Sequence, residues 1–233
     1  MTKQWRGAMA TLVLGAGLLS TAVQAGDAGR VVLAEGGVSV TRDGRMLPVR
    51  QGTVLMAGDV VGTSVDGGHV EWQAGDEAYF SLNRGSSFKI QEFSADEGGR
   101  ATYSLERGLY AAISGTIKTP DRHWVETEAA RIEVNGTKYK SAACKGNCRT
   151  RNGGSIADGT YVGVDEGQVT MSNRAGKLTL GAGQFGYAAS PNTAPVLLEG
   201  PPDIFLGAEA GFDFDFEFNI DPGLVIERPA SPS

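Results

Sequence analysis

The chain has 233 residues, of which 41% are hydrophobic and 34 are glycine, and its formal net charge at neutral pH is −6. Residues 1–25 carry Lys3 and Arg6 and no acidic residue, so their removal would make the net charge −8. An acidic surface argues against nucleic acid and anionic lipid as partners, because both are bound by basic surfaces.

The N-terminus has the three-part pattern of a secretory signal peptide. Two basic residues precede an apolar stretch from Ala8 to about Ala22, and Val23 and Ala25 place small side chains where a signal peptidase cleaves. An uncleaved anchor helix is the alternative, but the stretch is short for a membrane span and rich in Gly, Ala, Ser and Thr. We therefore expect residues 1–25 to be removed, and the mature protein to be periplasmic or secreted with no membrane span.

From residue 30 onward, short apolar alternations are separated by glycine-containing turns such as Asp43-Gly44, Ala57-Gly58-Asp59 and Asp66-Gly67-Gly68. Alternation of apolar and polar residues is typical of half-buried strands. The expected strands cover residues 38–40, 46–49, 54–56, 60–61, 69–72, 78–82, 87–93, 102–105, 109–113, 124–127, 131–134 and 161–164. Turn signals at about every 8–12 residues predict an all-β fold, a Gly-rich antiparallel β-sandwich or a short β-solenoid.

Two segments near the ends of this region resemble each other. Residues 35–40 and residues 166–171 both read Glu-Gly-x-apolar-x-apolar, and each is followed by a turn and by a return strand that ends in glycine. The match indicates either a pseudo-symmetric β structure or a coincidence between two Gly-rich hairpins. The sequence leaves both interpretations open.

The composition divides the chain into four parts: a signal peptide at 1–25, a β domain at 26–190, a Pro-rich linker at 191–205 and an acidic, aromatic tail at 206–233. Within the domain, residues 138–160 form a Gly- and Arg-rich excursion that contains both cysteines, so we expect an irregular loop there. An exported chain folds in an oxidising compartment, and Gly146-Asn147 permits a tight turn. A disulfide between Cys144 and Cys148 is therefore favoured. A redox role is disfavoured because the spacing is not CxxC.

The tail contains an alternating stretch from Phe212 to Phe218. In a strand, its four phenylalanines would lie on one face and its three acids on the other. The residues are Phe212, Phe214, Phe216 and Phe218, with Asp213, Asp215 and Glu217 between them. A calcium site is disfavoured, because successive carboxylates would be ~6.7 Å apart. We interpret the phenylalanines as a packing surface for the chain's own domain or for a partner.

No residue pattern indicates catalysis. His69 and His123 are far apart in sequence, and neither has a second His or Cys at metal-ligand spacing. Residues 181–186 match GxGxxG, but Pro191 follows too closely for the helix that a dinucleotide site requires. A nucleophile elbow and a P-loop are both missing from the sequence. We expect a non-enzymatic protein without a metal or cofactor.

The pattern of glycines and strands over residues 31–186 resembles the FecR domain family. The matching segments are Gly37-Val38-x-Val40, Pro48-Val49, Gly52, Leu55, Gly58-Asp59-x-Val61-x-Thr63, Leu82, Ser87, Ile90, Leu105-x-x-Gly108, Val125–Ala130, Ile132-x-Val134-Asn135-Gly136-Thr137, Gly163-Val164-x-Glu166-Gly167-x-Val169 and Ala182-Gly183-Gln184. The family-motif residues are Gly58, Asp59, Thr63, Gly136, Thr137, Glu166 and Gly167.

In the best-known family members this domain is the periplasmic part of an inner-membrane regulator, which passes a signal from an outer-membrane receptor to a sigma factor. Here we expect neither the cytoplasmic sigma-binding segment nor a retained membrane helix. The resemblance therefore implies an extracytoplasmic binding and signalling module that engages a protein or glycan partner in the cell envelope. The alternative is a structural component of the envelope or extracellular matrix.

Overall fold

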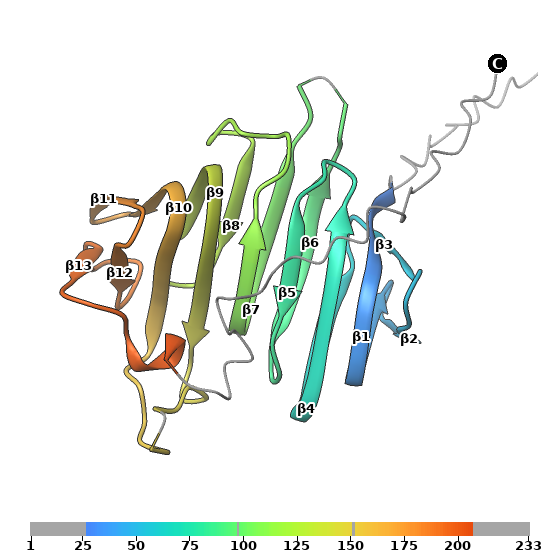
Figure 1. Cartoon of the computed structure of the whole chain (residues 1–233), viewed down its shortest axis with the longest axis horizontal. Helices are drawn as coiled ribbons and strands as arrows, with labels where there is room; N and C mark the ends of the chain where they lie inside the picture. Colours follow the sequence, from blue (N-terminus) through green and yellow to red (C-terminus); the bar gives the residue numbers. More distant parts are fainter. Residues whose placement is uncertain (1–26, 97, 151, 207–233) are drawn as a thin grey trace, which may run out of the picture.

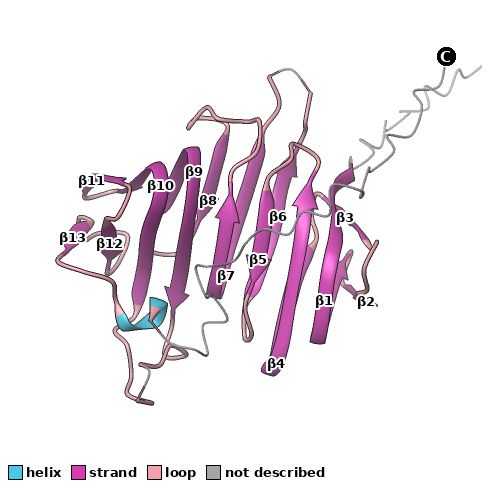
Figure 2. Ribbon diagram, viewed as in Figure 1, coloured by secondary structure: helices cyan, strands magenta, loops and turns pink. Residues whose placement is uncertain are grey.

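The computed structural model describes residues 27–206 except residues 97 and 151. Its elements are β1 Asp27–Arg42, β2 Arg45–Pro48, β3 Val54–Met56, β4 Val60–Ala74, β5 Tyr79–Leu82, β6 Ser87–Phe93, β7 Ala101–Ile113, β8 His123–Glu126, β9 Arg131–Cys144, β10 Gly159–Asn173, β11 Gly176–Gly181, β12 Phe185–Ala188, β13 Val196–Leu198 and the 3-10 turn η1 Asp203–Phe205. The all-β prediction is confirmed, and the strands stand side by side from β2 and β3 at one end to β13 at the other (Figures 1 and 2).

Strand pairing forms two layers. Layer A runs β3, β1, β4, β5, β7, β9, β10, β12 and β13, and uses the first half of β1 and β10 and the second half of β4, β7 and β9. Layer B runs β2, β1, β4, β6, β7, β8, β9, β10 and β11, and uses the other halves. Every pairing is antiparallel except β7 with β8, which is parallel. Strands β4, β5, β7 and β6 close into a small barrel.

Five long strands pass from one layer to the other, and each contains a glycine with positive φ near its middle. The values are 64° at Gly36 in β1, 135° at Gly67 in β4, 93° at Gly108 in β7, 62° at Gly136 in β9 and 79° at Gly167 in β10. A residue with a Cβ atom rarely adopts these angles, so glycine allows the strand to turn the corner without breaking its pairing. The abundant glycine therefore makes bends within strands as well as turns between them.

These bends correct two expectations from the sequence. Asp66-Gly67-Gly68 was expected to be a turn between strands but lies inside the continuous strand β4, where Gly68 pairs with Gly36 of β1. Residues 138–144 were expected to belong to the irregular excursion but form the end of β9. The irregular Cys-bearing loop is shorter than expected and covers residues 145–158 between β9 and β10.

The two similar segments occupy equivalent places at opposite ends of the fold. Gly36 and Gly167 both sit at the bend of a long strand that then forms a hairpin, β1 with β2 and β10 with β11. Equivalent backbone hydrogen bonds close both units: Gly52 N donates to Val31 O at 2.8 Å, and Gly183 N donates to Val164 O at 2.8 Å. The two segments therefore share one local topology, as the pseudo-symmetric interpretation predicts.

The main core lies between the layers and is rich in aromatic rings. Trp72 and Phe80 of layer A stack with ring centroids 4.9 Å apart, and Phe80 contacts Tyr103 of layer B at 4.9 Å. Phe88 of layer B contacts Tyr110 of layer A at 5.1 Å. Each of these five side chains is at most 1% exposed. Ring pairs in these tilted and offset arrangements stabilise beyond their buried area.

A second, smaller cluster covers the outside of layer A near β12. It contains Leu109, Ala142, Cys144, Cys148, Tyr161 and Phe205, with Phe185, Tyr187 and Leu198 packed against it. Phe205 belongs to η1 and Leu198 to β13, which pairs with β12. Residues 196–205, within the Pro-rich segment, therefore pack on the domain.

Candidate functional site

The motif residues Gly58, Asp59 and Thr63 lie at the start of β4 and bind other parts of the fold. Asp59 is fully buried, and Arg42 donates two hydrogen bonds to its carboxylate, from Nε and Nη2, at 2.7 Å each. The same carboxylate accepts a bond from Met56 N at 2.9 Å, and the Arg42 Nη2 atom also donates to Val54 O. Asp59 thus ties the β1–β2 hairpin to β3, and this role is structural.

Thr63, Gly136 and Thr137 lie at the corners where strands change layer. The Thr63 hydroxyl donates to Asn83 O at 2.6 Å and accepts from Ser86 N at 2.9 Å. The Thr137 hydroxyl donates to Gln168 O at 2.8 Å, next to the bend at Gly167. Both hydroxyl groups satisfy backbone groups that the bends leave without a strand partner, as buried polar groups require.

Glu166 precedes the bend of β10 at an exposed position, where it pairs in register with Lys138 of β9. Among the family-motif residues, Glu166 is therefore placed to meet another molecule, whereas the others lie at turns and corners of the fold. Most of the motif residues therefore stabilise the fold, and they do not form a binding site.

The outer face of layer A carries a row of polar and small residues, and this row is the candidate site. Strand register aligns one residue from each neighbouring strand: Glu71 with Ser81, Ser81 with Ala111, Ala111 with Lys140, and Lys140 with Gly163. Their neighbours along each strand point into the core, so these five point outward. Glu71 and Lys140 are three strands apart, or about 14 Å. The row thus has a buried acid and a buried base separated by small residues.

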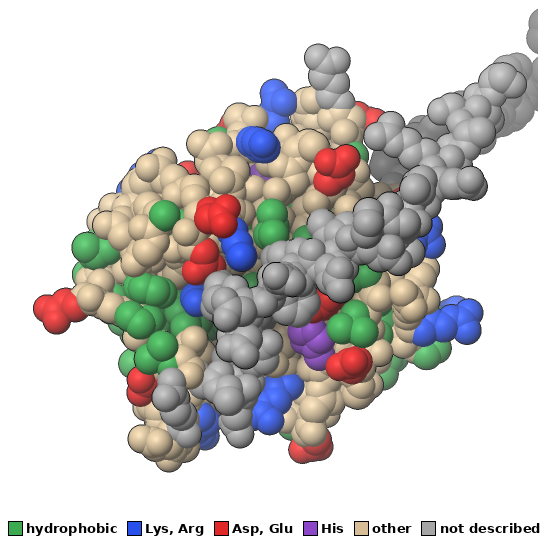
Figure 3. Space-filling model, viewed as in Figure 1, with side chains coloured by type: hydrophobic (Ala, Val, Ile, Leu, Met, Phe, Trp, Pro, Cys, Tyr) green, Lys and Arg blue, Asp and Glu red, His purple; other side chains and the backbone are tan. Residues whose placement is uncertain are grey.

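Glu71 is held ionised by its neighbours although only 3% of it is exposed. Its carboxylate accepts a bond from Tyr79 OH at 2.6 Å and a long one from Ser81 Oγ at 3.4 Å, and it lies 2.9 Å from His69 Nε2. Burial raises the pKa of Glu71, but the bonds from His69, Tyr79 and Ser81 outweigh burial and hold the pKa below its usual value. In Figure 3 a histidine is visible on this face beside acidic side chains.

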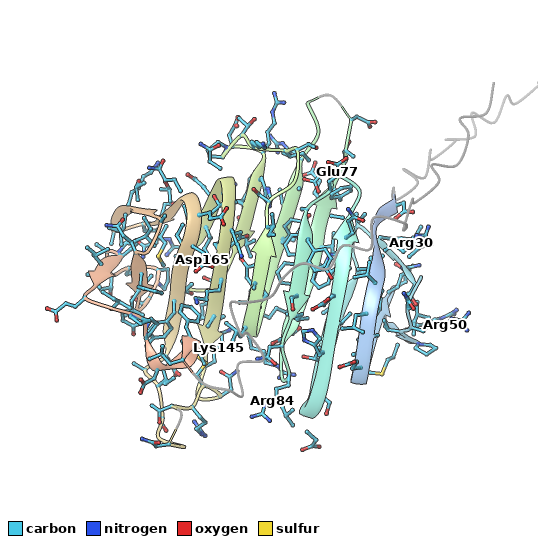
Figure 4. The ribbon with its side chains drawn as sticks, in the orientation of Figure 1. Arg30, Arg50, Glu77, Arg84, Lys145 and Asp165 are labelled. Atoms are coloured by element: carbon cyan, nitrogen blue, oxygen red, sulfur yellow. A yellow bond between two sulfur atoms is a disulfide. The ribbon has the colours of Figure 1, made fainter. Side chains whose placement is uncertain are left out.

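Lys140 lies on the β12 side of the row, between apolar rings and an acid. Its Nζ atom is 5.3 Å from the ring centre of Phe205 and 6.0 Å from that of Phe185. Burial lowers the pKa of Lys140 to about 8, against the attraction of Asp165, which raises it. Burial also raises the pKa of Asp165, against the attraction of Lys140 and Lys138. Figure 4 labels Asp165 on β10, beside this row.

The lowered pKa of Lys140 predicts a stability that depends on pH. The folded chain releases the Lys140 proton near pH 8 and the unfolded chain near 10.5, so between these values the unfolded chain binds more protons and stability rises with pH. The shift corresponds to about 3 kcal/mol. Between pH 7 and pH 10.5, we expect the free energy of unfolding of the wild type to rise by about 3 kcal/mol relative to that of Lys140→Gln. Urea denaturation at pH 7 and at pH 10.5 measures it. A constant difference would contradict this account of Lys140.

A disulfide, hydrogen bonds and an ion pair link the Cys-bearing loop to itself and to the domain. The sulfur atoms of Cys144 and Cys148 are 2.03 Å apart, which is disulfide distance. Gly146 N donates to Asp158 Oδ1 at 2.6 Å, and Tyr187 OH donates to Asp158 O at 2.6 Å. Lys145, labelled in Figure 4, forms an ion pair with Glu128 across the layers. The loop is therefore fixed at both of its ends.

A pocket of about 140 Å³ lies beside this loop. Its lining includes Glu128, Cys144, Lys145, Asp158, Thr160 and Ser190. Pockets that enclose metabolites or drug-sized ligands usually measure about 300–1,000 Å³. The pocket is therefore too small for such a ligand. Two of its charged groups, Lys145 and Glu128, form an ion pair with each other.

The disulfide closes a very short loop, so its removal is expected to change stability little. The double variant Cys144→Ser/Cys148→Ser should lose only about 1–2 kcal/mol of unfolding free energy, because a disulfide that closes a shorter loop removes less entropy from the unfolded chain. Thermal denaturation measures the loss. The wild type should also show no mass shift with a thiol reagent unless a reductant is added. Labelling without reductant would contradict the disulfide.

The two histidines lie in different layers, His123 at the start of β8 in layer B and His69 on β4 in layer A. His123 is buried beneath the β7–β8 connection, where its Nδ1 atom is 3.1 Å from Ile117 O, and His69 contacts Glu71. Within residues 27–206, apart from 97 and 151, the structure contains no cluster of three His, Cys, Asp or Glu side chains that could hold a metal ion. In the same described part of the chain, no helix is long and apolar enough to span a membrane.

Two groups of residues singled out from the sequence lie outside the described residues. They are the signal peptide and the tail phenylalanines Phe212, Phe214, Phe216 and Phe218. Conversely, sequence reasoning did not single out Glu71, Tyr79 or Lys140. The spacing of His69 and Glu71 places both side chains on one face of a strand and was the available signal for half of the row. Lys140 had no such signal, because its neighbours come from non-adjacent strands.

Comparison with known proteins gives a distant similarity of fold. No family model and no curated protein matches the chain. Among solved structures, two crystal structures of a candidate anti-sigma factor from Parabacteroides distasonis ATCC 8503, at 1.65 Å and 2.50 Å resolution, are similar to it at 14% sequence identity, with TM-scores of 0.46 and 0.47. Each match covers 60% of this chain and 59% of the other chain.

Proposed function

We propose that this protein is an exported, non-enzymatic binding and signalling module of the FecR-domain type, which engages a protein or glycan partner in the cell envelope. The motif residues of the FecR resemblance support this proposal, since Asp59 ties a hairpin to β3, and Thr63 and Thr137 hold corners of the domain. A scaffold of this kind presents faces and edges rather than an enclosed active site.

The observation that carries the proposal is the row on the outer face of layer A. A buried carboxylate and a buried ammonium stand on the outside of one sheet, about 14 Å apart, with small side chains between them. Burying charge costs stability, and apolar residues would serve a purely structural face better. A broad face with polar groups at fixed positions suits an extended macromolecular partner.

The test compares capture by two single variants of the tagged mature protein. Lys138→Glu changes the outer face of layer A, and Lys89→Glu makes the same change on β6 in layer B at a position of similar exposure. After purification from the periplasm and mass spectrometry, we expect Lys138→Glu to lose a partner that the wild type and Lys89→Glu retain. Circular dichroism checks that both variants fold. Equal capture by both variants, or no shared partner, would contradict the proposal.

Export has its own test at the N-terminus. Cleavage after Ala25 predicts that the mature chain begins at Gly26, because Val23 and Ala25 occupy the positions that signal peptidase selects. N-terminal sequencing of the periplasmic or secreted fraction should therefore begin at Gly26. Recovery of a chain that begins at Met1 in the membrane fraction would replace this proposal with a membrane anchor.

A further inference from the structure

The last described residues bring the chain to the outer face of layer A. In η1, Phe205 packs into the cluster over β9 and β10 and lies 5.3 Å from the Lys140 ammonium. Leu206 follows directly, with 42% of its surface exposed. The next 27 residues, 207–233, therefore start beside the row, at its β12 end.

We propose that residues 207–233 occupy the outer face of layer A in the same chain, with the phenylalanines of 212–218 on the row and the intervening acids directed to Lys138 and Lys140. This inference rests on the proposed function, because the segment would then cover the face that binds the partner and compete with it. The C-terminal segment is thus an intramolecular ligand of the binding face.

Length permits this arrangement. Five residues separate Leu206 from Phe212, and six extended steps span about 20 Å at ~3.3 Å per residue. Neighbouring strands are about 4.8 Å apart, so this span crosses about four strands. Starting beside β10 and β12, Phe212–Phe218 can therefore reach β9, β7 and β5, where Lys140, Ala111 and Ser81 lie.

Shape and charge also fit. On β5 and β7 the floor of the row is made of Ser81 and Ala111, whose small side chains leave room for aromatic rings, and Ile113 lies on the same side of β7. On β10 the Phe185 ring already covers Gly163. Lys138 and Lys140 stand two residues apart on β9. Their partners in register are Ile113 and Ala111 on β7, and Glu166 and Gly163 on β10.

The segment carries six acids and one arginine, a net charge of −5. Of the acids already on the face, Glu71 bonds with His69, Tyr79 and Ser81, and Asp165 faces Lys140. A long lysine side chain can extend beside a bound strand toward the strand's acidic edge.

Zero-length carbodiimide cross-linking of the full mature chain tests the arrangement. We expect amide links from Lys138 or Lys140 to Asp213, Asp215 or Glu217. Lys89 of β6 and Lys177 of β11, both in layer B, should not link to the tail. Mixing light and 15N-labelled chains shows whether each link lies within one chain. Links to Lys89 or Lys177 in place of β9, links only between light and heavy chains, or no link to β9 would overturn the inference.

A variant separates packing from simple charge attraction. Phe212→Ser/Phe214→Ser/Phe216→Ser/Phe218→Ser keeps every acid, so it should lose the β9 links several-fold if the rings seat the segment. Unchanged links would overturn the inference. If this inference failed, the result of the capture test with Lys138→Glu and Lys89→Glu would not change. The inference and the proposed function can therefore fail separately.

Discussion

Replacing Asp59 with alanine is expected to lower the free energy of unfolding by about 3–5 kcal/mol, because it removes one partner of a buried ion pair and leaves the other unpaired. Asp59 is fully buried and accepts bonds from both Arg42 and Met56 N. The Arg42 side chain is 29% exposed and can partly return to water, which favours the lower end of this range. Urea denaturation monitored by tryptophan fluorescence measures the change.

The matched control is Asp66→Ala, at an exposed position of the same strand. Surface substitutions of this kind usually change stability by less than about 0.5 kcal/mol. Arg42→Ala and the double variant complete a cycle, and their effects should be strongly non-additive because the two side chains bond directly. If Asp59→Ala were as stable as Asp66→Ala, the carboxylate would not be holding the hairpin to β3.

Replacing Gly167 with alanine is expected to cost about 2–5 kcal/mol, or to prevent folding. The φ of 79° alone costs a residue with a Cβ atom about 1–2 kcal/mol. In addition, the new methyl group would overlap the carbonyl oxygen of Gly136 on β9, which is backbone and can move only if β9 moves. Forcing an extra methyl group into a packed site adds about 1–3 kcal/mol.

Gly183→Ala separates these two contributions. Gly183 has nearly the same φ, 77°, but no atom lies within 4 Å of the position its Cβ would take. This variant should therefore lose only about 1–2 kcal/mol. Thermal and urea denaturation of both variants give the comparison, and equal losses would show that the bend of β10 tolerates a side chain against Gly136.

The sequence predicted where strands and glycines fall but not how glycines are used. Asp43-Gly44 makes the hairpin turn it predicts, whereas Asp66-Gly67-Gly68 bends one continuous strand. Both segments combine Asp with Gly, and both need positive φ. Whether a strand ends or bends there depends on its partner, since Gly68 pairs with Gly36 of β1. That pairing is non-local and is not visible in either segment.

The candidate site was less predictable than the fold. The motif residues chosen from the sequence proved to be structural, because Asp59, Thr63 and Thr137 satisfy turns and corners. The row from Glu71 to Lys140 depends on the register of four strands, and a slip of one residue in any strand would turn its side chain inward. A list of expected strands does not specify register, so the row could only come from the structure.

The closed barrel of β4, β5, β7 and β6 has a consequence for how the domain folds. Strands β5 and β6 both use β7 as their second neighbour, through its later and earlier halves. Until β7 is available, each has an unpaired edge, and neither layer is sealed around the aromatic core. Because five strands belong to both layers, one layer cannot melt while the other persists. The domain should therefore fold and unfold in a single cooperative step. During synthesis, this step cannot be completed before residues 101–113, which form β7, have been translated.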